Sequence, residues 1–225
     1  LRELPGMGEK SERDILSAIA DFEAMPHERR LIHEAMQEAR EYIAYMKRCK
    51  AVSTITYAGS LRRGVETIGD VDLLVCGRDH VTIMNHFVAY KEVRSVLGRG
   101  DTKCSVLLLS GMQVDLRVLD KRVFGAGLHY FTGSKAHNIK IRDRAKRMGF
   151  KVSEYGVFRV TRGRGGRGAR ETFIGGATEE ELFHLLKLPY IPPELREDRG
   201  EIAYADRHKK VPMLVKDLYT WINIS

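Results

Sequence analysis

Apolar and polar residues alternate along four short stretches between positions 51 and 120, and this spacing places successive side chains on opposite faces of a strand. The stretches read STITYAGS, DVDLLV, CSVLLLSG and QVDLRVL. Between the last two, the letters LSGMQV place a glycine in a short polar break, which predicts a hairpin turn. A helix is predicted inside this strand-rich region, around HVTIMNHFVAY.

Helical spacing replaces the alternation on both sides of the strand-rich region. Residues 27–50 place apolar side chains three and four positions apart, which predicts an amphipathic helix. A second helix is predicted after Ser134 as its N-cap and is stopped at Gly149, and a third begins at Thr178. The stretch PYIPPELRE then predicts an extended segment, because proline restricts both its own backbone and that of the preceding residue.

These patterns predict an α+β fold with soft boundaries near positions 50, 121 and 200. A chain of 225 residues is long enough for one large domain or for two to three small ones. The four segments are a helical start, a strand-rich middle, a mixed segment and a short tail, at 1–50, 51–121, 122–200 and 201–225.

The strand DVDLLV carries Asp70 and Asp72 two positions apart, so both carboxylates point to the same face. Val71 and Leu73 point to the opposite face, toward a core. Two carboxylates this close repel each other, and a divalent cation that prefers oxygen ligands, such as Mg²⁺, offsets that repulsion. The alternative is an exposed edge strand whose two acids are solvated.

A loop just before this strand is suited to hold phosphate. Gly59 and Ser60 end one strand and begin a turn, where glycine lets backbone N–H groups approach an anion closely. Arg62 and Arg63 follow at once, and the planar guanidinium fork matches phosphate oxygens. A phosphate site and a metal site on adjacent pieces of chain suit a nucleoside triphosphate whose phosphates are bridged by metal.

A third carboxylate fits the same scheme. In QVDLRVL, Asp115 alternates with apolar residues and therefore faces away from the core. If its strand pairs beside the strand of Asp70 and Asp72, three carboxylates converge. Three carboxylates can hold two metal ions about 3.5–4 Å apart, one activating a hydroxyl nucleophile and the other stabilising a leaving pyrophosphate.

The net charge of +8 is concentrated in one part of the chain. Residues 135–170 hold twelve lysines and arginines against two acids, whereas residues 1–50 hold nine basic and ten acidic residues. A local basic patch is expected of a surface that faces a polyanion such as nucleic acid. The alternative is a solvated basic helix followed by the Gly/Arg segment TRGRGGRGAR, which either faces DNA or is only a connection.

Three cysteines lie far apart without metal-ligand spacing, which predicts free, buried thiols and a reducing cytoplasm: Cys49, Cys76 and Cys104. No apolar run approaches 18 residues, and the first residues lack the pattern of a signal peptide. We therefore expect a cytoplasmic protein that does not enter a membrane.

Several motifs, in the same order along the chain, resemble those of one enzyme family. Gly-Ser, a spacer and Asp-x-Asp resemble the signature of nucleotidyltransferases. More closely, four segments are similar to the bacterial and archaeal branch of the DNA polymerase X family: GSLRRGVETIGDVDLLV, QVDLRV, HYFTGSKAHNIKIRDRAKRMGFKVSEYGVF and LPYIPPELREDRGEI. The resemblance implies a palm with a mixed sheet at 51–121, preceded by a partial DNA-binding subdomain at 1–50 and followed by an α/β nucleotide-binding subdomain at 122–200.

The resemblance also implies roles for individual residues. Asp70, Asp72 and Asp115 match the catalytic carboxylates that bind two Mg²⁺ ions, for which Mn²⁺ can substitute. Another group matches positions that contact the incoming nucleotide, namely its triphosphate, its sugar and the minor-groove side of its base pair: Gly59, Ser60, Arg63, Gly69, Tyr130, Phe131, Gly133 and Asn138.

DNA contacts are implied at two further places. The segment LPGMGEKSERDIL resembles a helix-hairpin-helix, in which Gly6 and Gly8 offer backbone N–H groups to a DNA phosphate and whose carbonyls also hold a monovalent cation. Arg117, Lys140 and Arg142 match residues that reach the DNA. The chain departs from the vertebrate enzyme at Gln113, Lys135 and Ile139, where base stacking and fidelity are expected to differ.

The function that the resemblance implies is templated transfer of a nucleotide from a dNTP to a primer 3′-hydroxyl, with gap filling in DNA repair and replication. The expected partners are primer–template or gapped DNA and a dNTP, and we expect a monomer. The tail at 201–225 leads toward a missing C-terminal domain of the PHP type, and the N-terminal lyase-like domain is also absent, so the chain is a core fragment or a natural minimal form. The alternatives are a nucleotidyltransferase that acts on RNA ends or small molecules, and a catalytically weak DNA-binding fragment.

Overall fold

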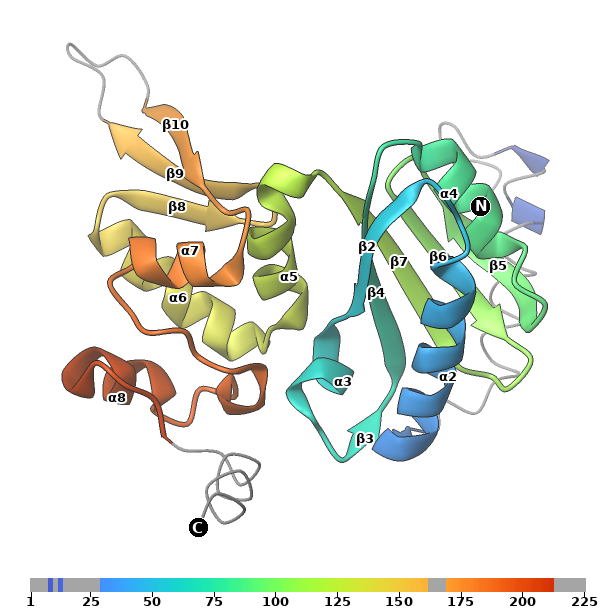
Figure 1. Ribbon diagram of the computed structural model, residues 1–225, viewed down its shortest axis with the longest axis horizontal. Coiled ribbons are helices and arrows are strands. Elements are labelled where there is room, and N and C mark those ends of the chain that lie inside the picture. Colours follow the sequence, from blue (N-terminus) through green and yellow to red (C-terminus); the bar gives the residue numbers. More distant parts are fainter. Residues whose placement is uncertain (1–7, 10–11, 14–28, 162–168, 213–225) are drawn as a thin grey trace.

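The structure is a computed structural model that describes residues 8–9, 12–13, 29–161 and 169–212. It confirms the α+β class, with two units side by side, each with its own sheet and its own apolar core (Figure 1). Most of the predicted helix-hairpin-helix, including Gly6, and most of the Gly/Arg segment lie outside the described residues.

The first unit, residues 30–119, is built on a five-stranded sheet in the order β2-β4-β7-β6-β5. Strands β4 and β7 are parallel and the other neighbouring strands are antiparallel, so the sheet is mixed as predicted. The elements of this unit are β1 (Arg30–Leu31), α2 (Ile32–Met46), β2 (Val52–Tyr57), α3 (Gly59–Arg63), β3 (Thr67–Ile68), β4 (Asp70–Gly77), α4 (His80–Val88), β5 (Val93–Arg99), β6 (Lys103–Leu108) and β7 (Gln113–Leu119).

One face of this sheet is apolar because alternate residues of its strands point to it. Val71 and Leu73 of β4 and Val114 of β7 are buried there against α2 and α4. The aromatic ring of Tyr42 stacks on that of Phe87, with the centroids 4.9 Å apart. This packing fixes the sheet from one side and leaves the polar residues of β4 and β7 on the other.

The helix predicted over residues 27–50 is shorter than expected. It begins at Ile32, and the two residues before it form strand β1, which pairs with β3. The backbone N–H of Ile32 donates to the carbonyl of Glu66 at 3.0 Å, so the backbone before the helix is hydrogen-bonded to the segment that carries β3. Leu31, expected on the apolar face of the helix, is 53% exposed.

The second unit, residues 121–208, has a three-stranded antiparallel sheet in the order β10-β9-β8. Its core is formed by apolar residues of α5, α6 and α7 together with the inner face of this sheet. Its elements are η1 (Lys121–Val123), α5 (Phe124–Thr132), α6 (Lys135–Arg147), β8 (Phe150–Ser153), β9 (Gly156–Thr161), β10 (Arg170–Gly175), α7 (Glu179–Leu185), η3 (Pro193–Leu195) and α8 (Glu201–His208).

The predicted helix caps are confirmed, and the predicted extended segment is only partly right. The side chain of Ser134 accepts a hydrogen bond from the His137 N–H, and that of Thr178 accepts one from the Glu181 N–H. Within PYIPPELRE, residues Pro193–Leu195 form a turn of 3₁₀-helix, because a proline at the first helical position loses no backbone hydrogen bond.

The predicted cysteine state is confirmed, since all three thiols are free and buried. Among the described helices, none combines the length and the apolar character that a membrane crossing requires.

Candidate active site

The candidate site lies where β4 and β7 run side by side. In their parallel register Asp72 is paired with Asp115, and Asp70 is paired with Gln113. The three aspartates point away from the apolar face that holds Val71, so the predicted pairing of the two strands is confirmed. The carboxylates therefore share one polar face of the sheet.

Burial and repulsion both disfavour the charged forms of Asp70 and Asp72. Burial, and then the nearby charges of Asp70 and Asp115, raise the pKa of Asp72 to about 7. Burial and the charge of Asp115 also raise the pKa of Asp70, against a smaller lowering effect of Arg29. A group of carboxylates that resists ionisation in this way favours a cation as its partner.

The side chains as they stand do not converge on one point, which corrects the expectation of three convergent carboxylates. Gln113 Nε2 lies 3.2 Å from Asp115 Oδ1 and 3.3 Å from its Oδ2, and donates to them. Across the described part of the chain, no three His, Cys, Asp or Glu side chains form a group that could hold a metal ion. Like-charge repulsion and the amide of Gln113 account for this open arrangement. The donor chemistry still fits a hard divalent cation, since all three groups are carboxylates on one face.

Gly59 and Asp72 touch so closely that position 59 accepts only glycine. The Ala58 N–H donates to the Asp72 carbonyl at 2.8 Å, which brings the start of α3 against β4. Gly59 has φ +59°, and a Cβ atom there would lie 2.2 Å from Asp72 Oδ2. The predicted turn at Gly59 and Ser60 is therefore the first residue pair of a short helix rather than the end of β2.

A cleft of about 620 Å³ joins this face to the second unit. It is lined by three residues that the sequence did not single out for a role there, Arg29, Val65 and Thr132, and by Lys135, where base stacking was expected to differ. It is also lined by ten of the predicted site residues: Gly59, Ser60, Arg63, Asp70, Asp72, Tyr130, Phe131, Gly133, Asn138 and Arg142.

Arg63 of the first unit is held in the cleft by two segments of the second. Its Nε donates to Glu197 Oε1 at 2.6 Å, and its Nη1 donates to the Thr132 carbonyl at 2.6 Å. Gly133 has φ +71°, and a Cβ atom there would lie 3.2 Å from Arg63 Nη1. The guanidinium is thus oriented by α5 and by the segment that precedes α8.

Asn138 carries a free buried acceptor at the edge of the same cleft. Its Nδ2 donates to the Tyr130 carbonyl at 2.7 Å. Its Oδ1 is buried and has no hydrogen-bond partner among the residues that the structure describes. Asn138 and Arg142 both line the cleft, as their spacing of four positions on a helix predicts. A ligand that donates a hydrogen bond could satisfy this oxygen.

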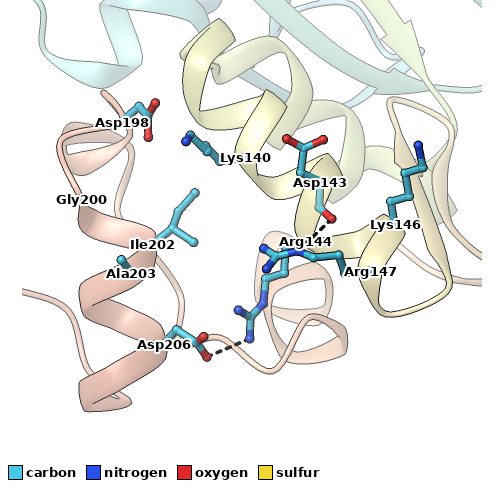
Figure 2. A pocket seen from close by; sticks show the side chains of 10 residues that line it. All are labelled: Lys140, Asp143, Arg144, Lys146, Arg147, Asp198, Gly200, Ile202, Ala203 and Asp206. Carbon is cyan, nitrogen blue, oxygen red and sulfur yellow. Dashed lines mark hydrogen bonds and ion pairs between the residues drawn. The ribbon is translucent and has the colours of Figure 1, made fainter.

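Four predicted residues lie outside the lining of the cleft. Asp115 sits one strand away from it, and Gly69 is exposed at the corner before β4. The Arg117 guanidinium lies over the ring of Phe131, 4.7 Å from its centroid. Lys140 projects from α6 toward α8 and lines a separate groove of about 750 Å³ (Figure 2). Lys140 lies two positions from Asn138, which turns it to another face of the helix.

Gly8, where the resemblance implies a DNA contact, is exposed, and its carbonyl accepts a hydrogen bond from the Glu12 N–H at 3.0 Å.

The sequence reasoning did not find a role for Arg29. Its Nε donates to Thr67 Oγ1 at 2.8 Å, and its charge lowers the pKa of Asp70. Arg29 precedes the helix by three residues, and only the pairing of β1 with β3 carries it across to the cleft. A periodicity argument contains no signal for such a contact.

The sequence reasoning also missed a buried network that joins the two units. Arg62 of α3 donates to both carboxylate oxygens of Glu179, at 3.0 and 2.6 Å. Arg196 Nη1 donates to Glu179 Oε1 at 2.6 Å, and both of these groups are at most 4% exposed. Burial raises the pKa of Glu179, but the hydrogen bond from Arg62 and the charge of Arg196 outweigh it and hold that pKa at about 2. Arg62 therefore fixes the second unit beside the carboxylate face, and Arg196 holds Glu179 from within the second unit.

Comparison with known proteins agrees with this geometry. Residues 26–119 match the family model described as DNA polymerase beta palm, and residues 127–197 match the one described as DNA polymerase beta thumb. The first range holds the carboxylate strands, and the second holds the α5–α6 side of the cleft. The two units thus correspond to two domains of a polymerase class.

Three curated proteins show the same relationship. The chain is 37% identical over 206 residues to the DNA polymerase/3′-5′ exonuclease PolX of Bacillus subtilis. The matched stretch covers 90% of this chain and 35% of that protein. It is 27% identical over 166 residues to DNA polymerase lambda of Arabidopsis thaliana, covering 63% of this chain and 31% of that protein. It is 30% identical over 159 residues to DNA polymerase lambda of Rattus norvegicus, covering 62% and 28%.

The chain belongs to the DNA polymerase X family, and its first and second units are the palm and the thumb of that family. It spans about a third of the length of these relatives. The expected family membership, and with it the nucleotidyltransferase type of the palm, is confirmed.

Proposed function

We propose that this chain carries the polymerising part of a DNA polymerase, which transfers a nucleotide from a dNTP to a primer 3′-hydroxyl on a DNA template. The observation that carries the proposal is the parallel register that pairs Asp72 with Asp115 at the edge of a cleft that Arg63 and Asn138 also line. Its substrates are primer–template or gapped DNA and a dNTP. We propose that the chain divides into a catalytic palm at residues 51–121 and a nucleotide-binding subdomain at residues 122–200.

In the reaction, the primer 3′-oxygen attacks the α-phosphorus, and the bond from this phosphorus to the bridging oxygen of the β-phosphate breaks. Pyrophosphate leaves, and the proton of the hydroxyl passes to the carboxylate of Asp115. Gln113 donates to that carboxylate and orients it. Such positioning supplies much of the rate enhancement in phosphoryl and nucleotidyl transfer.

Asp70, Asp72 and Asp115 would hold two divalent cations, Mg²⁺ or Mn²⁺. When bound, these ions would lower the pKa of the attacking hydroxyl and neutralise charge on the pyrophosphate. The raised pKa of Asp72 and its crowding by Asp70 support this proposal, because a cation would relieve the repulsion.

The cleft residues bind and orient the nucleotide. Arg63, held by Glu197 and the Thr132 carbonyl, keeps one guanidinium nitrogen, Nη2, available for phosphate oxygens. Gly59, Ser60 and Gly69 flank the same end of the cleft, and Tyr130, Phe131 and Gly133 lie beside the sugar. Asn138 and Arg142 face the new base pair. Further DNA contacts are made by Arg117, Lys140 and the hairpin at Gly6 and Gly8. The hairpin is also the proposed site for a monovalent cation.

The test is primer extension on gapped DNA with all four dNTPs and Mg²⁺. We expect Asp115→Ala to lower incorporation by about 10³-fold or more while the protein remains folded. The matched control is Asp101→Asn, which removes an exposed acid from the turn between β5 and β6 and is expected to change little. Folded Asp115→Ala protein that still extends the primer would overturn the assignment.

Two other outcomes separate the alternatives. Extension of an RNA end without extension of DNA would favour a different nucleotidyltransferase. Salt-sensitive DNA binding without any incorporation at saturating Mg²⁺ or Mn²⁺ would favour an inactive DNA-binding fragment, because each phosphate contact adds to the salt dependence. Gap filling in repair is tested by comparing gapped DNA with and without a downstream 5′-phosphate.

A further inference from the structure

Helix α8 is tied to α6 at both of its ends. At its start, Glu201 Oε1 lies 2.7 Å from Nδ1 of His137. Near its end, Asp206 Oδ1 accepts a hydrogen bond from Nη2 of Arg144 at 2.9 Å, as the dashed line in Figure 2 shows. The two helices therefore run alongside each other, and the groove of Figure 2 lies between them.

The tie at Glu201 is buried, and both carboxylate oxygens accept hydrogen bonds, whereas Nε2 of His137 is buried without a partner among the described residues. His137 is 0% exposed and Glu201 is 6% exposed. Besides the bond to His137, Oε1 accepts from the Asp198 N–H at 3.2 Å and Oε2 accepts from the Arg199 N–H at 2.8 Å. One carboxylate thus closes the turn before α8 and joins it to the first turns of α6.

The charge states of this pair favour a neutral imidazole and an ionised carboxylate. Burial lowers the pKa of His137, more than Glu201 raises it, and the Arg196 guanidinium lowers it further. Burial raises the pKa of Glu201, but the bond from His137 and the N–H of Asp198 hold it below its ordinary value. The neutral ring donates from Nδ1, which fixes its orientation in α6.

The same segment also touches the candidate active site. The Ser134 N–H, at the cap of α6, donates to the Arg196 carbonyl at 2.9 Å. One residue further, Glu197 holds Nε of Arg63 at 2.6 Å. Residues 196–201 therefore connect an arginine of the cleft to the helix that carries Asn138, which directly follows His137.

We propose that Glu201 is a positioning residue, which acts through His137 to hold the first turns of α6 so that Asn138 and Arg142 face the nucleotide. This role rests on the proposed function, because it concerns binding of the incoming dNTP. Glu201 itself is not among the residues that line the cleft. Its loss should leave the carboxylates of the first unit in place and loosen only the opposite wall.

A first experiment tests the tie without any substrate. Hydrogen–deuterium exchange is measured for peptides covering residues 135–142 in the wild type, in Glu201→Ala and in the control Asp206→Ala. Asp206→Ala also removes one tie of α8, but at the exposed far end of the helix. We expect faster exchange of the amides at 138–142 in Glu201→Ala alone. Equal exchange in all three folded proteins would overturn the proposal.

A second experiment measures dNTP affinity by calorimetry on the complex with gapped DNA, with Ca²⁺ in place of Mg²⁺. We expect the Kd for the correct dNTP to rise about tenfold in Glu201→Ala, which corresponds to one lost hydrogen bond to a charged group. Glu201→Gln keeps an acceptor for His137 Nδ1–H, so its Kd should stay within about threefold of the wild type. Asp206→Ala should stay within about twofold.

The outcomes keep the two proposals apart. Wild-type protein that binds dNTP, together with folded Glu201→Ala that binds it equally well, would overturn the positioning role alone. Wild-type protein that binds no dNTP would overturn the proposed function, and the positioning role with it. If Glu201→Ala does not stay folded by thermal unfolding, Glu201→Leu and Glu201→Gln decide by the same two measurements, with Leu expected to behave as Ala.

Discussion

A half-buried carboxylate of the first unit and a buried one of the second show opposite electrostatics. Asp72 lies among like charges, and its pKa is raised to about 7 by burial and by its aspartate neighbours. Glu179 lies between Arg62 and Arg196, and its pKa is held at about 2 although burial opposes this. Both groups are carboxylic acids with similar ordinary pKa values, so their surroundings and not their residue type separate them.

The difference distinguishes a carboxylate that supports the fold from one that serves a ligand. Glu179 is satisfied by groups of the chain itself, so its charge stabilises the junction between the units. Burial and two aspartates oppose the charge of Asp72 more than Arg117 and Arg63 favour it, so folding places it in a state that a cation would improve. Removing charge from the two sites should therefore change stability in opposite directions.

The largest effect is expected at the satisfied site. Glu179→Gln leaves Arg62 and Arg196 buried without a counter-charge, and this should lower the free energy of unfolding by about 3–5 kcal/mol. Urea unfolding followed by circular dichroism measures it. The matched control is Glu171→Gln, whose partner Lys151 is exposed, and the loss there should be about 1 kcal/mol or less. Equal losses at both positions would contradict the assignment of Glu179 as structural.

A smaller effect of opposite sign is expected at the unsatisfied site. The pKa of Asp72 is raised in the folded state, so at pH values above about 7 its ionisation lowers the stability of the fold. At pH values below the ordinary pKa of an aspartate the group is protonated in both the folded and the unfolded state, and this penalty vanishes. Asp72→Asn should therefore raise the free energy of unfolding at pH 8, without divalent cations, by roughly 1–3 kcal/mol.

The control for this prediction is a different kind of aspartate. Asp79 caps α4 by accepting from the Thr82 N–H, and Asp79→Asn should not stabilise the protein. The gain at Asp72 should also disappear when the unfolding is repeated near pH 4. If Asp72→Asn instead lowered the free energy of unfolding at pH 8, the claim that the charge of Asp72 opposes folding would be wrong.

The third effect sharpens the comparison by pH. Protons compete with a cation for Asp72, and its pKa of about 7 places this competition between pH 6 and pH 8. The half-saturating concentration of Mn²⁺, followed by electron paramagnetic resonance, should be about tenfold higher at pH 6 than at pH 8. A site that bound Mn²⁺ equally well at both pH values would show that Asp72 does not take part.

The sequence alone predicts the carboxylate face well. Alternation in DVDLLV and QVDLRVL predicted correctly which side chains of β4 and β7 face the core, and the spacing of Asn138 and Arg142 placed both in one cleft. These are local properties, decided within a few residues by strand or helix geometry. The identity of the family came from the order of several motifs and not from periodicity.

The rest depends on contacts between distant parts of the chain. Arg62 and Glu179 are 117 positions apart, and no pattern in either segment indicates the other. Lys140 lies in the same motif as Asn138, but two positions turn its side chain away from the cleft, and it lines the groove toward α8. Leu31 has an apolar side chain at helical spacing, yet strand pairing takes it out of the helix.

The parallel register of β4 and β7 has a consequence for how the protein reaches its final shape. Asp72 and Asp115 are separated by 43 positions, and closing a long segment precedes any gain from the contact. Pairing of β4 with β7 also brings like charges together, so repulsion opposes this step of folding. Divalent ions added during refolding should speed this step, because they neutralise the charges of the aspartates. The metal site would then help to form the sheet on which its own ligands lie.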